Sequence, residues 1–196
     1  RKDPFPSLTN KDGSYYEIST LKLGNVNNAA YPGNKIQKIN RTSNDIKDNL
    51  EFKLIVIKRS QQLKHHSGEM GFPGGMYENF DANLLATAIR ETQEEMGITL
   101  TQADFLGALN EVVTLTKFHI SPFVFYLDQE PKFLINAEIE SVHYLSLKEL
   151  IDKKDYGFKS VLYQNRVWHA HRFSHSAGVI WGATANMIHQ LVERLN

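Results

Sequence analysis

The most constraining stretch of this chain is residues 90–97, which read RETQEEMG. In a helix, Glu91, Glu94 and Glu95 are spaced i, i+3 and i+4, so their carboxylates project from one face. Carboxylate oxygens suit hard divalent cations, and Mg²⁺ is usually held by a few carboxylates together with substrate phosphates. The spacing therefore predicts a metal site that acts on phosphate, with a solvated acidic face on a surface helix as the alternative.

The residues on either side of this run favour the metal site. Upstream, residues 72–75 read FPGG, a stiff loop ending in two glycines that let the backbone approach a ligand closely. Downstream, Gly97 stands where a C′ glycine stops a helix. The helix is expected from about Asn83 to Met96, with Asp81 or Asn83 as N-cap. Its expected apolar side, separate from the acidic side, comprises Leu85, Ala88, Ile89, Thr92 and Met96.

This unit resembles the signature of the Nudix hydrolases, G-x5-E-x7-R-E-U-x-E-E-x-G-U, in which U is aliphatic. The second half is matched by Arg90, Glu91, Glu94, Glu95, Gly97 and Ile98, with Thr92 at an aliphatic position. The first half departs, because Met76 and Ala82 stand at its glycine and glutamate positions. Aligning Gly75 instead requires one extra residue and makes Asp81 the acidic substitute.

A second motif is similar to the coenzyme A pyrophosphatase branch of that family. Residues 55–75, IVIKRSQQLKHHSGEMGFPGG, resemble L-L-T-x-R-[SA]-x3-R-x3-G-x3-F-P-G-G, with Ile57 and Lys64 replacing the threonine and the second arginine. Residues 136–139 and 180–185 resemble two further segments of the branch. The branch also accepts a shifted, aspartate-containing first half of the signature, and the likeness covers residues 51–196.

The resemblance implies an α/β (α+β) Nudix fold, in which a mixed β-sheet is sandwiched between helices. It also implies a pyrophosphohydrolase that cleaves the diphosphate of coenzyme A or its acyl derivatives to 3′,5′-ADP and (acyl-)4′-phosphopantetheine. Mg²⁺ or Mn²⁺ is the implied cofactor, held by Glu91, Glu94, Glu95 and the carbonyl of Gly75. Two alternatives remain: a Nudix hydrolase of ADP-ribose, a dinucleotide cofactor or another nucleoside diphosphate derivative, and a nucleotide-sensing Nudix module without catalysis.

Two further groups belong to the candidate catalytic set. The general base for the attacking water is one of the helix glutamates, or a loop carboxylate such as Glu138 or Glu140. Arg90 is expected to pair with a neighbouring carboxylate and orient the acidic cluster, since a cation beside the metal would otherwise repel it.

The candidate substrate-binding residues lie around the glycine loop. Arg59 is a candidate phosphate ligand, or else part of a surface salt bridge. Gly74 and Gly75 bring backbone close to the substrate. The positive cluster of Lys64, His65, His66 and Arg172 is a candidate site for the extra phosphate of coenzyme A. The rings of Phe72, Tyr77 and Trp168 either stack on an adenine or pack in the core.

Composition restricts the remaining possibilities. The 196 residues, 41% of them hydrophobic, predict a single domain over residues 1–196. Its first part, at about residues 1–50, is atypical. Within that segment, residues 15–18 or 35–39 are expected to form edge strands. Lys plus Arg balance Asp plus Glu at 22 each, so no nucleic-acid partner is expected. The absence of cysteine excludes disulfides and thiolate sites. No apolar run reaches membrane-spanning length and no signal peptide is evident. A cytoplasmic protein without a membrane partner is therefore expected. A homodimer is compatible with the sequence.

Hydrophobic patterns predict the other elements. Strands are expected at residues 54–57, 105–109, 112–116, 120–127, 142–145 and 166–173, with Pro122 placing the start of the fourth at an edge or bulge. Ser146 is expected to cap a short helix through Ile151, and residues 179–195 to form a closing amphipathic helix. His169, His171 and His175 suggest a zinc site, although nothing else in the chain has structural zinc spacing.

Overall fold

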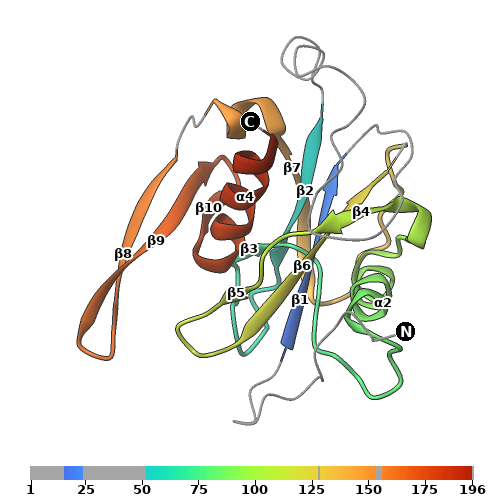
Figure 1. Ribbon diagram of the computed structural model, residues 1–196, viewed down its shortest axis with the longest axis horizontal. Coiled ribbons are helices and arrows are strands. Elements are labelled where there is room, and N and C mark those ends of the chain that lie inside the picture. Colours follow the sequence, from blue (N-terminus) through green and yellow to red (C-terminus); the bar gives the residue numbers. More distant parts are fainter. Residues whose placement is uncertain (1–15, 24–51, 128, 153–155, 196) are drawn as a thin grey trace.

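The computed structural model describes residues 16–23, 52–127, 129–152 and 156–195, and for residues 16–23 only the backbone path. Its central strands lie between two helices, α2 (Leu84–Met96) and α4 (Gly182–Leu195) (Figure 1). The predicted arrangement of a mixed β-sheet layer sandwiched between helices is confirmed. No helix of the described residues is long and apolar enough to cross a membrane.

The strands form three hydrogen-bonded groups. In the first, β6 (His119–Tyr126) pairs in parallel with β1 (Tyr16–Leu23) and antiparallel with β4 (Phe105–Ala108) and β5 (Val112–Val113). In the second, β2 (Lys53–Arg59) lies between β3 (Met70–Gly71) and β7 (Ile139–Ser146). In the third, β9 (Arg166–His175) lies between β8 (Tyr156–Tyr163) and β10 (Gly178–Trp181). The chain is completed by the short helices η1 (Gln102–Asp104) and α3 (Leu147–Ile151).

Strand β2 carries the core on both of its faces. Leu54 and Val56 belong to the hydrophobic cluster that includes α4, whereas Ile55 and Ile57 belong to the cluster that includes α2. Alternate residues of a strand point to opposite faces, so a strand covered on both sides reads as a continuous apolar run. Each such side chain contributes about 1.5–3 kcal/mol by burial. Because both faces are packed, the end of the strand at Arg59 is held in a fixed place.

Helix α2 begins and ends where local signals place it. The Asn83 side chain accepts a hydrogen bond from the backbone N–H of Ala86 at 2.9 Å, so Asn83 rather than Asp81 is the N-cap. Gly97 has φ of 69° and donates its N–H to Gln93, which ends the helix. The buried side is rotated from the predicted one: Leu85 and Ile89 are only partly buried, whereas the buried residues are Leu84, Thr87, Ala88, Thr92, Glu95 and Met96.

Several predicted boundaries are corrected. Residues 179–181 belong to strand β10 because they pair with β9, and the closing helix begins only at Gly182, whose φ is 64°. Strand β5 stops at Val113 because a turn follows, closed by the N–H of Thr114 bonding to the carbonyl of Phe118. Pro122 lies inside β6 and not at its start. Before Pro122 the strand pairs with β5, and after it the strand pairs with β4, so the proline stands where the neighbouring strand changes.

The remaining predicted strands and the short helix are present near their expected places. Strand β7 begins at Ile139, three residues before its predicted start, and Ser146 caps α3 by accepting from the N–H of Glu149 at 3.4 Å. Of the two candidate N-terminal strands, residues 15–18 overlap β1, which lies at the edge of its group and pairs with β6 among the described strands. The other candidate, residues 35–39, lies outside the described residues.

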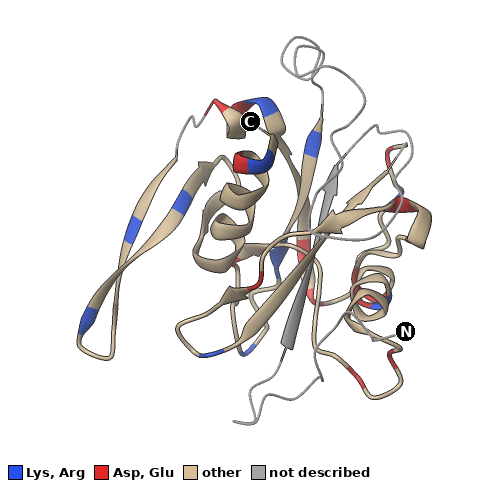
Figure 2. Cartoon of the chain, viewed as in Figure 1, with Lys and Arg blue, Asp and Glu red and all other residues tan. Residues whose placement is uncertain are grey.

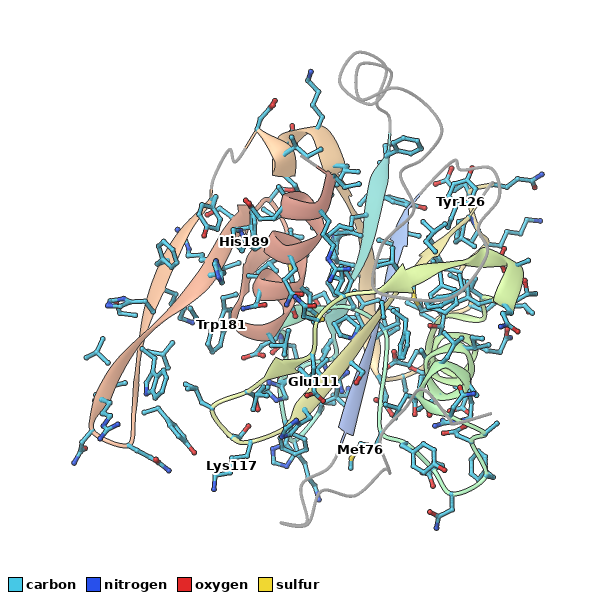
Figure 3. All side chains as sticks on the ribbon, viewed as in Figure 1. Met76, Glu111, Lys117, Tyr126, Trp181 and His189 are labelled. Carbon is cyan, nitrogen blue, oxygen red and sulfur yellow. The ribbon has the colours of Figure 1, made fainter. Side chains whose placement is uncertain are left out.

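Strands β8 and β9 form a long hairpin that extends from the central strands (Figure 1). Its base meets α4, where His189 lies on the side of the helix that faces β9 (Figure 3). Charged residues of both signs are scattered over the rest of the described chain, but the hairpin carries only Lys and Arg (Figure 2).

Candidate active site

The three helix glutamates differ sharply in exposure. Glu95 is 3% exposed, whereas the side chain of Glu91 is 16% exposed and that of Glu94 is 55% exposed. The expectation that the acidic and core sides of the helix are separate is therefore wrong, because Glu95 belongs to both. Its carboxylate accepts a hydrogen bond from the backbone N–H of Gly74 at 3.0 Å, which ties the glycine loop to the helix.

Burial is the main influence on Glu95. It raises the pKa of Glu95 to about 7, helped by the negative charges of Glu91 and Glu138 and opposed by the Gly74 hydrogen bond and Arg59. Burial likewise raises the pKa of Glu91, although Arg90 opposes the shift and the charges of Glu94 and Glu138 add to it. These carboxylates are therefore close enough to repel one another, and the site is short of positive charge.

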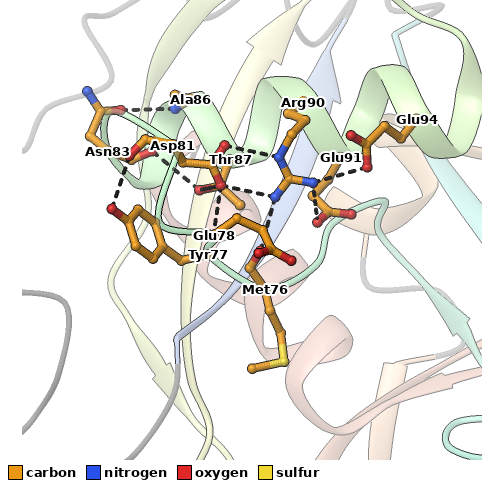
Figure 4. Close-up of polar contacts among 10 residues, drawn as sticks. All are labelled: Met76, Tyr77, Glu78, Asp81, Asn83, Ala86, Thr87, Arg90, Glu91 and Glu94. Atoms are coloured by element: carbon orange, nitrogen blue, oxygen red, sulfur yellow. Dashed lines mark hydrogen bonds and ion pairs between the residues drawn. The ribbon is translucent and has the colours of Figure 1, made fainter.

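Arg90 is the centre of a partly buried hydrogen-bond network that joins helix α2 to the loop before it (Figure 4). Its Nη1 donates to Oε1 of Glu91 at 2.8 Å and to Oε2 of Glu94 at 3.0 Å. Its Nε and Nη2 donate to the two carboxylate oxygens of Asp81, both at 3.0 Å, and Nη2 also donates to the carbonyl of Met76 at 3.1 Å. Five bonds match the five N–H groups of a guanidinium, so every donor is used. The predicted pairing of Arg90 with neighbouring carboxylates is present.

Asp81 anchors this network. Besides Arg90, its carboxylate accepts from the hydroxyl of Thr87 at 2.8 Å and from the backbone N–H of Glu78 at 3.0 Å. Burial alone would raise the pKa of Asp81, but the hydrogen bonds from Arg90, Glu78 and Thr87 together lower it. The aspartate in the irregular first half of the signature therefore holds Arg90, a role that its sequence position did not reveal.

The glycine at position 75 accommodates the close approach of Glu91. A Cβ atom at Gly75 would overlap the carboxylate of Glu91. Any other residue would have to displace either the loop or the glutamate, so this glycine lets the loop backbone lie directly against the acidic side chain.

Arg59 lies between two carboxylates without bonding either. Its Nη1 is 3.7 Å from Oε1 of Glu95 and its Nη2 is 3.6 Å from Oε2 of Glu138, both too long for hydrogen bonds. Its Nε is buried and has no hydrogen-bond partner among the described residues. The guanidinium therefore sits beside the acidic cluster with N–H donors still available.

The loop before β7 brings Glu138 to the same place. The carbonyl of Glu138 accepts from the N–H of Ser60 at 2.8 Å, and its own N–H donates to the side chain of Asn136 at 2.9 Å. Asn136 in turn donates its N–H to the carbonyl of Glu95 at 3.0 Å. Sequence reasoning missed this positioning role of Asn136; the available signal was an asparagine two residues before a candidate carboxylate.

Glu140 is directed elsewhere. Its carboxylate pairs with Lys58 at 2.6 Å, and Lys58 lowers the pKa of Glu140. Lys58 and Arg59 are consecutive in β2 and therefore point to opposite faces. Of the two predicted loop carboxylates, the structure brings only Glu138 to the acidic cluster.

The remaining candidates are distributed around the site. Of the two roles expected for Phe72, stacking on an adenine or packing in the core, the structure shows core packing, because the residue is 6% exposed and belongs to the hydrophobic core. Lys64 and His65 are exposed in the loop between β2 and β3. Tyr77 donates its hydroxyl to the carbonyl of Asp81, and Trp168 is exposed on the hairpin. Arg172 donates to the neighbouring Ser174 of its own strand.

The histidines do not form the suggested zinc site. His171 stacks on His189 with ring centroids 4.4 Å apart, while His169 bonds to Ser160 and His175 accepts from the N–H of Ala177. In the described part of the chain, no three His, Asp or Glu side chains gather around one point as metal ligands.

The acidic cluster nevertheless fits a divalent cation by its chemistry. Its donors are carboxylates, the ligands that Mg²⁺ and Mn²⁺ prefer. Its carboxylates raise one another's pKa, a repulsion that a cation would relieve. Glu91 and Glu94 share Nη1 of Arg90, whereas the bonds of Nε and Nη2 go to Asp81 and Met76. Arg90 would therefore stay anchored if both glutamates turned from it to a cation.

Comparison with known proteins identifies the family of this chain. The NUDIX domain family model matches residues 46–166. The chain is 32% identical over 145 residues to the "Uncharacterized Nudix hydrolase NudL" of Cronobacter sakazakii, covering 70% of this chain and 72% of the relative. It is 29% identical over 143 residues to the protein of the same name from Photorhabdus laumondii, covering 72% and 76%.

Solved structures show the same fold at low sequence identity. The NUDIX domain of Shewanella oneidensis NrtR, complexed with ADP ribose, superposes with a TM-score of 0.56 at 14% identity, covering 99% of this chain and 94% of that one. A bifunctional NMN adenylyltransferase/ADP ribose pyrophosphatase from Francisella tularensis superposes with a TM-score of 0.54 at 16% identity, covering 100% and 43%. The fold, the acidic helix and the matched domain agree, and the chain belongs to the Nudix hydrolase family.

Proposed function

We propose that this protein is a metal-dependent diphosphatase that cleaves coenzyme A or its acyl derivatives. Water adds to one phosphorus of the diphosphate and the bridging P–O bond breaks, giving 3′,5′-ADP and (acyl-)4′-phosphopantetheine. The coenzyme A assignment rests on the motif at residues 55–75, and the position of Arg59 between Glu95 and Glu138 supports a contact with the phosphates of the substrate.

The acidic helix supplies the charge that this chemistry needs. Glu91, Glu94, Glu95 and the Gly75 carbonyl would hold Mg²⁺ or Mn²⁺, which neutralises phosphate charge and makes bound water more acidic. Arg90 keeps Glu91 and Glu94 oriented and is itself fixed by Asp81. A bound cation would relieve the mutual repulsion of the carboxylates, so the cluster is suited to bind a cation together with an anionic substrate.

Arg59 and Glu138 complete the proposed site. The Nη1 and Nη2 donors of Arg59, which lie too far from Glu95 and Glu138 for hydrogen bonds, can bind two oxygens of a phosphate, a geometry that a guanidinium favours. Glu138 is half exposed, and backbone hydrogen bonds fix its loop to the ends of β2 and α2. We assign it the role of general base, which accepts the proton of the attacking water.

A substrate panel tests the assignment. Purified protein with Mg²⁺ or Mn²⁺ is incubated with coenzyme A, acetyl-coenzyme A, dephospho-coenzyme A, ADP-ribose and NADH, and the products are separated by chromatography. The expected products from coenzyme A are 3′,5′-ADP and 4′-phosphopantetheine. Faster cleavage of ADP-ribose or NADH would move the assignment to the alternative nucleoside diphosphate substrates. Binding of a panel member without cleavage would replace the enzyme with a nucleotide-sensing module.

A further inference from the structure

The hairpin of β8 and β9 exposes apolar side chains that the proposed diphosphatase site does not use. Phe158 is 59% exposed, Leu162 72% and Val167 62%. Strand β10 pairs with β9 only over the last four residues of β9, from Arg172 to His175. Within the described residues, the rest of the hairpin is therefore two-stranded. A two-stranded hairpin is marginally stable in water unless another layer covers it.

Strand register places these three side chains on one face. Phe158 is opposite His171, and Leu162 is opposite Val167, so all four share a face. At the base of the hairpin the same face is already packed, because Tyr156 and His171 stack on His189 of α4 and Phe173 is buried. We call this the uncharged face; its eight members are Tyr156, Phe158, Ser160, Leu162, Val167, His169, His171 and Phe173.

The charges of the hairpin lie on the opposite face. Lys159, Arg166 and Arg172 alternate with the members of the uncharged face, and the hairpin contains no Asp or Glu (Figure 2). Lys159 also lies 3.8 Å from the centre of the Trp181 ring on this charged face. The polar members of the uncharged face are paired with one another, Ser160 with His169 and Tyr156 with His171. Covering the uncharged face therefore buries no Asp, Glu, Lys or Arg.

This separation distinguishes between possible partners. A nucleic acid or an anionic lipid surface would be attracted to the charged face and would leave Phe158, Leu162 and Val167 in water. A second copy of the chain, packed through the same face, covers these three side chains and keeps all six cations of the two hairpins pointing outward. The formal net charge of the chain is +0, so two copies do not repel each other at long range.

We propose that two copies of this protein form a dimer by packing the uncharged faces of their hairpins against each other. A two-fold axis relates the two copies, so the contact is isologous and both copies use the same surface. Phe158, Leu162 and Val167 of one copy pack against the uncharged face of the other. The two ribbons lie about 10 Å apart, the usual spacing of sheets packed face to face.

Sedimentation velocity over a series of protein concentrations tests the dimer. The wild-type chain is expected to be dimeric, and Leu162→Glu is expected to raise the dimer dissociation constant at least about tenfold, because it places a carboxylate in an apolar contact. Arg166→Glu is the matched control, since it puts the same side chain at the hairpin tip on the charged face, and it is expected to leave the dissociation constant near the wild-type value. Both positions are exposed, and circular dichroism checks that each variant folds.

Crosslinking locates the contact independently. The chain has no cysteine, so Leu162→Cys and Arg166→Cys each introduce a single thiol. A short bis-maleimide is expected to join two copies through Leu162→Cys much more efficiently than through Arg166→Cys. A wild-type chain that stays monomeric at every concentration would overturn the proposal, as would a dimer that tolerates Leu162→Glu. A monomer that sediments with vesicles of anionic phospholipid would overturn it in favour of a lipid partner.

Discussion

Asp81 and Arg90 form a two-pronged ion pair in which Nε and Nη2 of the arginine each lie 3.0 Å from a different carboxylate oxygen. The pair joins the loop after the two glycines to the middle of α2. It leaves Nη1 of Arg90 to orient Glu91 and Glu94. Asp81 lies in the half of the Nudix signature that departs from the family pattern. Through Arg90 it thereby orients the glutamates of the half that matches the pattern.

The first prediction concerns this pair. Asp81→Asn is expected to lower the free energy of unfolding by about 3 kcal/mol, because the partly buried guanidinium of Arg90 loses the charged partner that binds both Nε and Nη2. It is also expected to lower kcat, since Glu91 and Glu94 lose their fixed neighbour. Urea denaturation and steady-state kinetics measure the two effects. Glu78→Gln removes an exposed carboxylate from the same loop and serves as control; equal effects of the two variants would contradict the anchoring role.

The second prediction concerns Glu95 in protein kept free of metal by EDTA. The raised pKa of Glu95, about 7 against an ordinary value of 4.5, means that the folded state binds its proton more tightly than the unfolded state. The stabilisation is complete below about pH 4.5 and is lost as pH rises through 7, by an amount on the order of 3 kcal/mol. Glu95→Gln carries no titrating proton and is expected to lose less stability across this window. Urea unfolding of both proteins across this pH range measures the difference, and parallel curves would rule the effect out.

The third prediction concerns Arg59. Arg59→Lys keeps a positive charge near Glu95 and Glu138 but loses the planar pair of donors, so kcat/KM is expected to fall roughly tenfold to a hundredfold with little change in stability. Lys58→Met, on the opposite face of the same strand, is the control and is expected to keep kcat/KM near the wild-type value. Kinetics and thermal unfolding of both variants are the measurements. A normal kcat/KM in Arg59→Lys would exclude a two-donor phosphate contact.

The fourth prediction compares two glycines. Gly75→Ala places a methyl group into the Glu91 carboxylate, so it is expected to weaken Mn²⁺ binding at least about tenfold by displacing a ligand. Gly71→Ala is the matched control, because the nearest atom to its new Cβ is the Thr184 hydroxyl at an ordinary 3.7 Å. Titration calorimetry with Mn²⁺ distinguishes the variants. Similar affinities in both would mean that the contact between Gly75 and Glu91 does not shape the cation site.

The fifth prediction concerns the exposed loop between β2 and β3. The double change Lys64→Ala and His65→Ala is expected to raise KM for coenzyme A far more than KM for dephospho-coenzyme A, because only the former carries the 3′-phosphate. Gln62→Ala, exposed in the same loop, is expected to change neither value. Kinetics with both substrates at equal ionic strength measure the ratio. If KM rises equally for the two substrates, these side chains do not recognise that phosphate.

Local elements were predictable because their signals are local. Asn83 and Gly97 bracket α2 through hydrogen bonds to residues three and four positions away, so the sequence marks both ends of the helix. Strand β2 was predictable from an unbroken run of apolar and β-branched residues. The segment at 179–181 was not, because whether an apolar run continues a helix or pairs as β10 depends on β9, which the pattern alone does not include.

The order of residues determined the acidic helix, its two ends and the glycine loop before it, since these depend on neighbours within a few positions of the chain. Tertiary structure decided the burial of Glu95, the packing of Phe72 in the core and the placement of Arg59 between Glu95 and Glu138. These contacts join residues that are tens of positions apart, where periodicity carries no information. Their geometry exists only once both faces of β2 are packed and the end of that strand is fixed against α2 and the loop before β7.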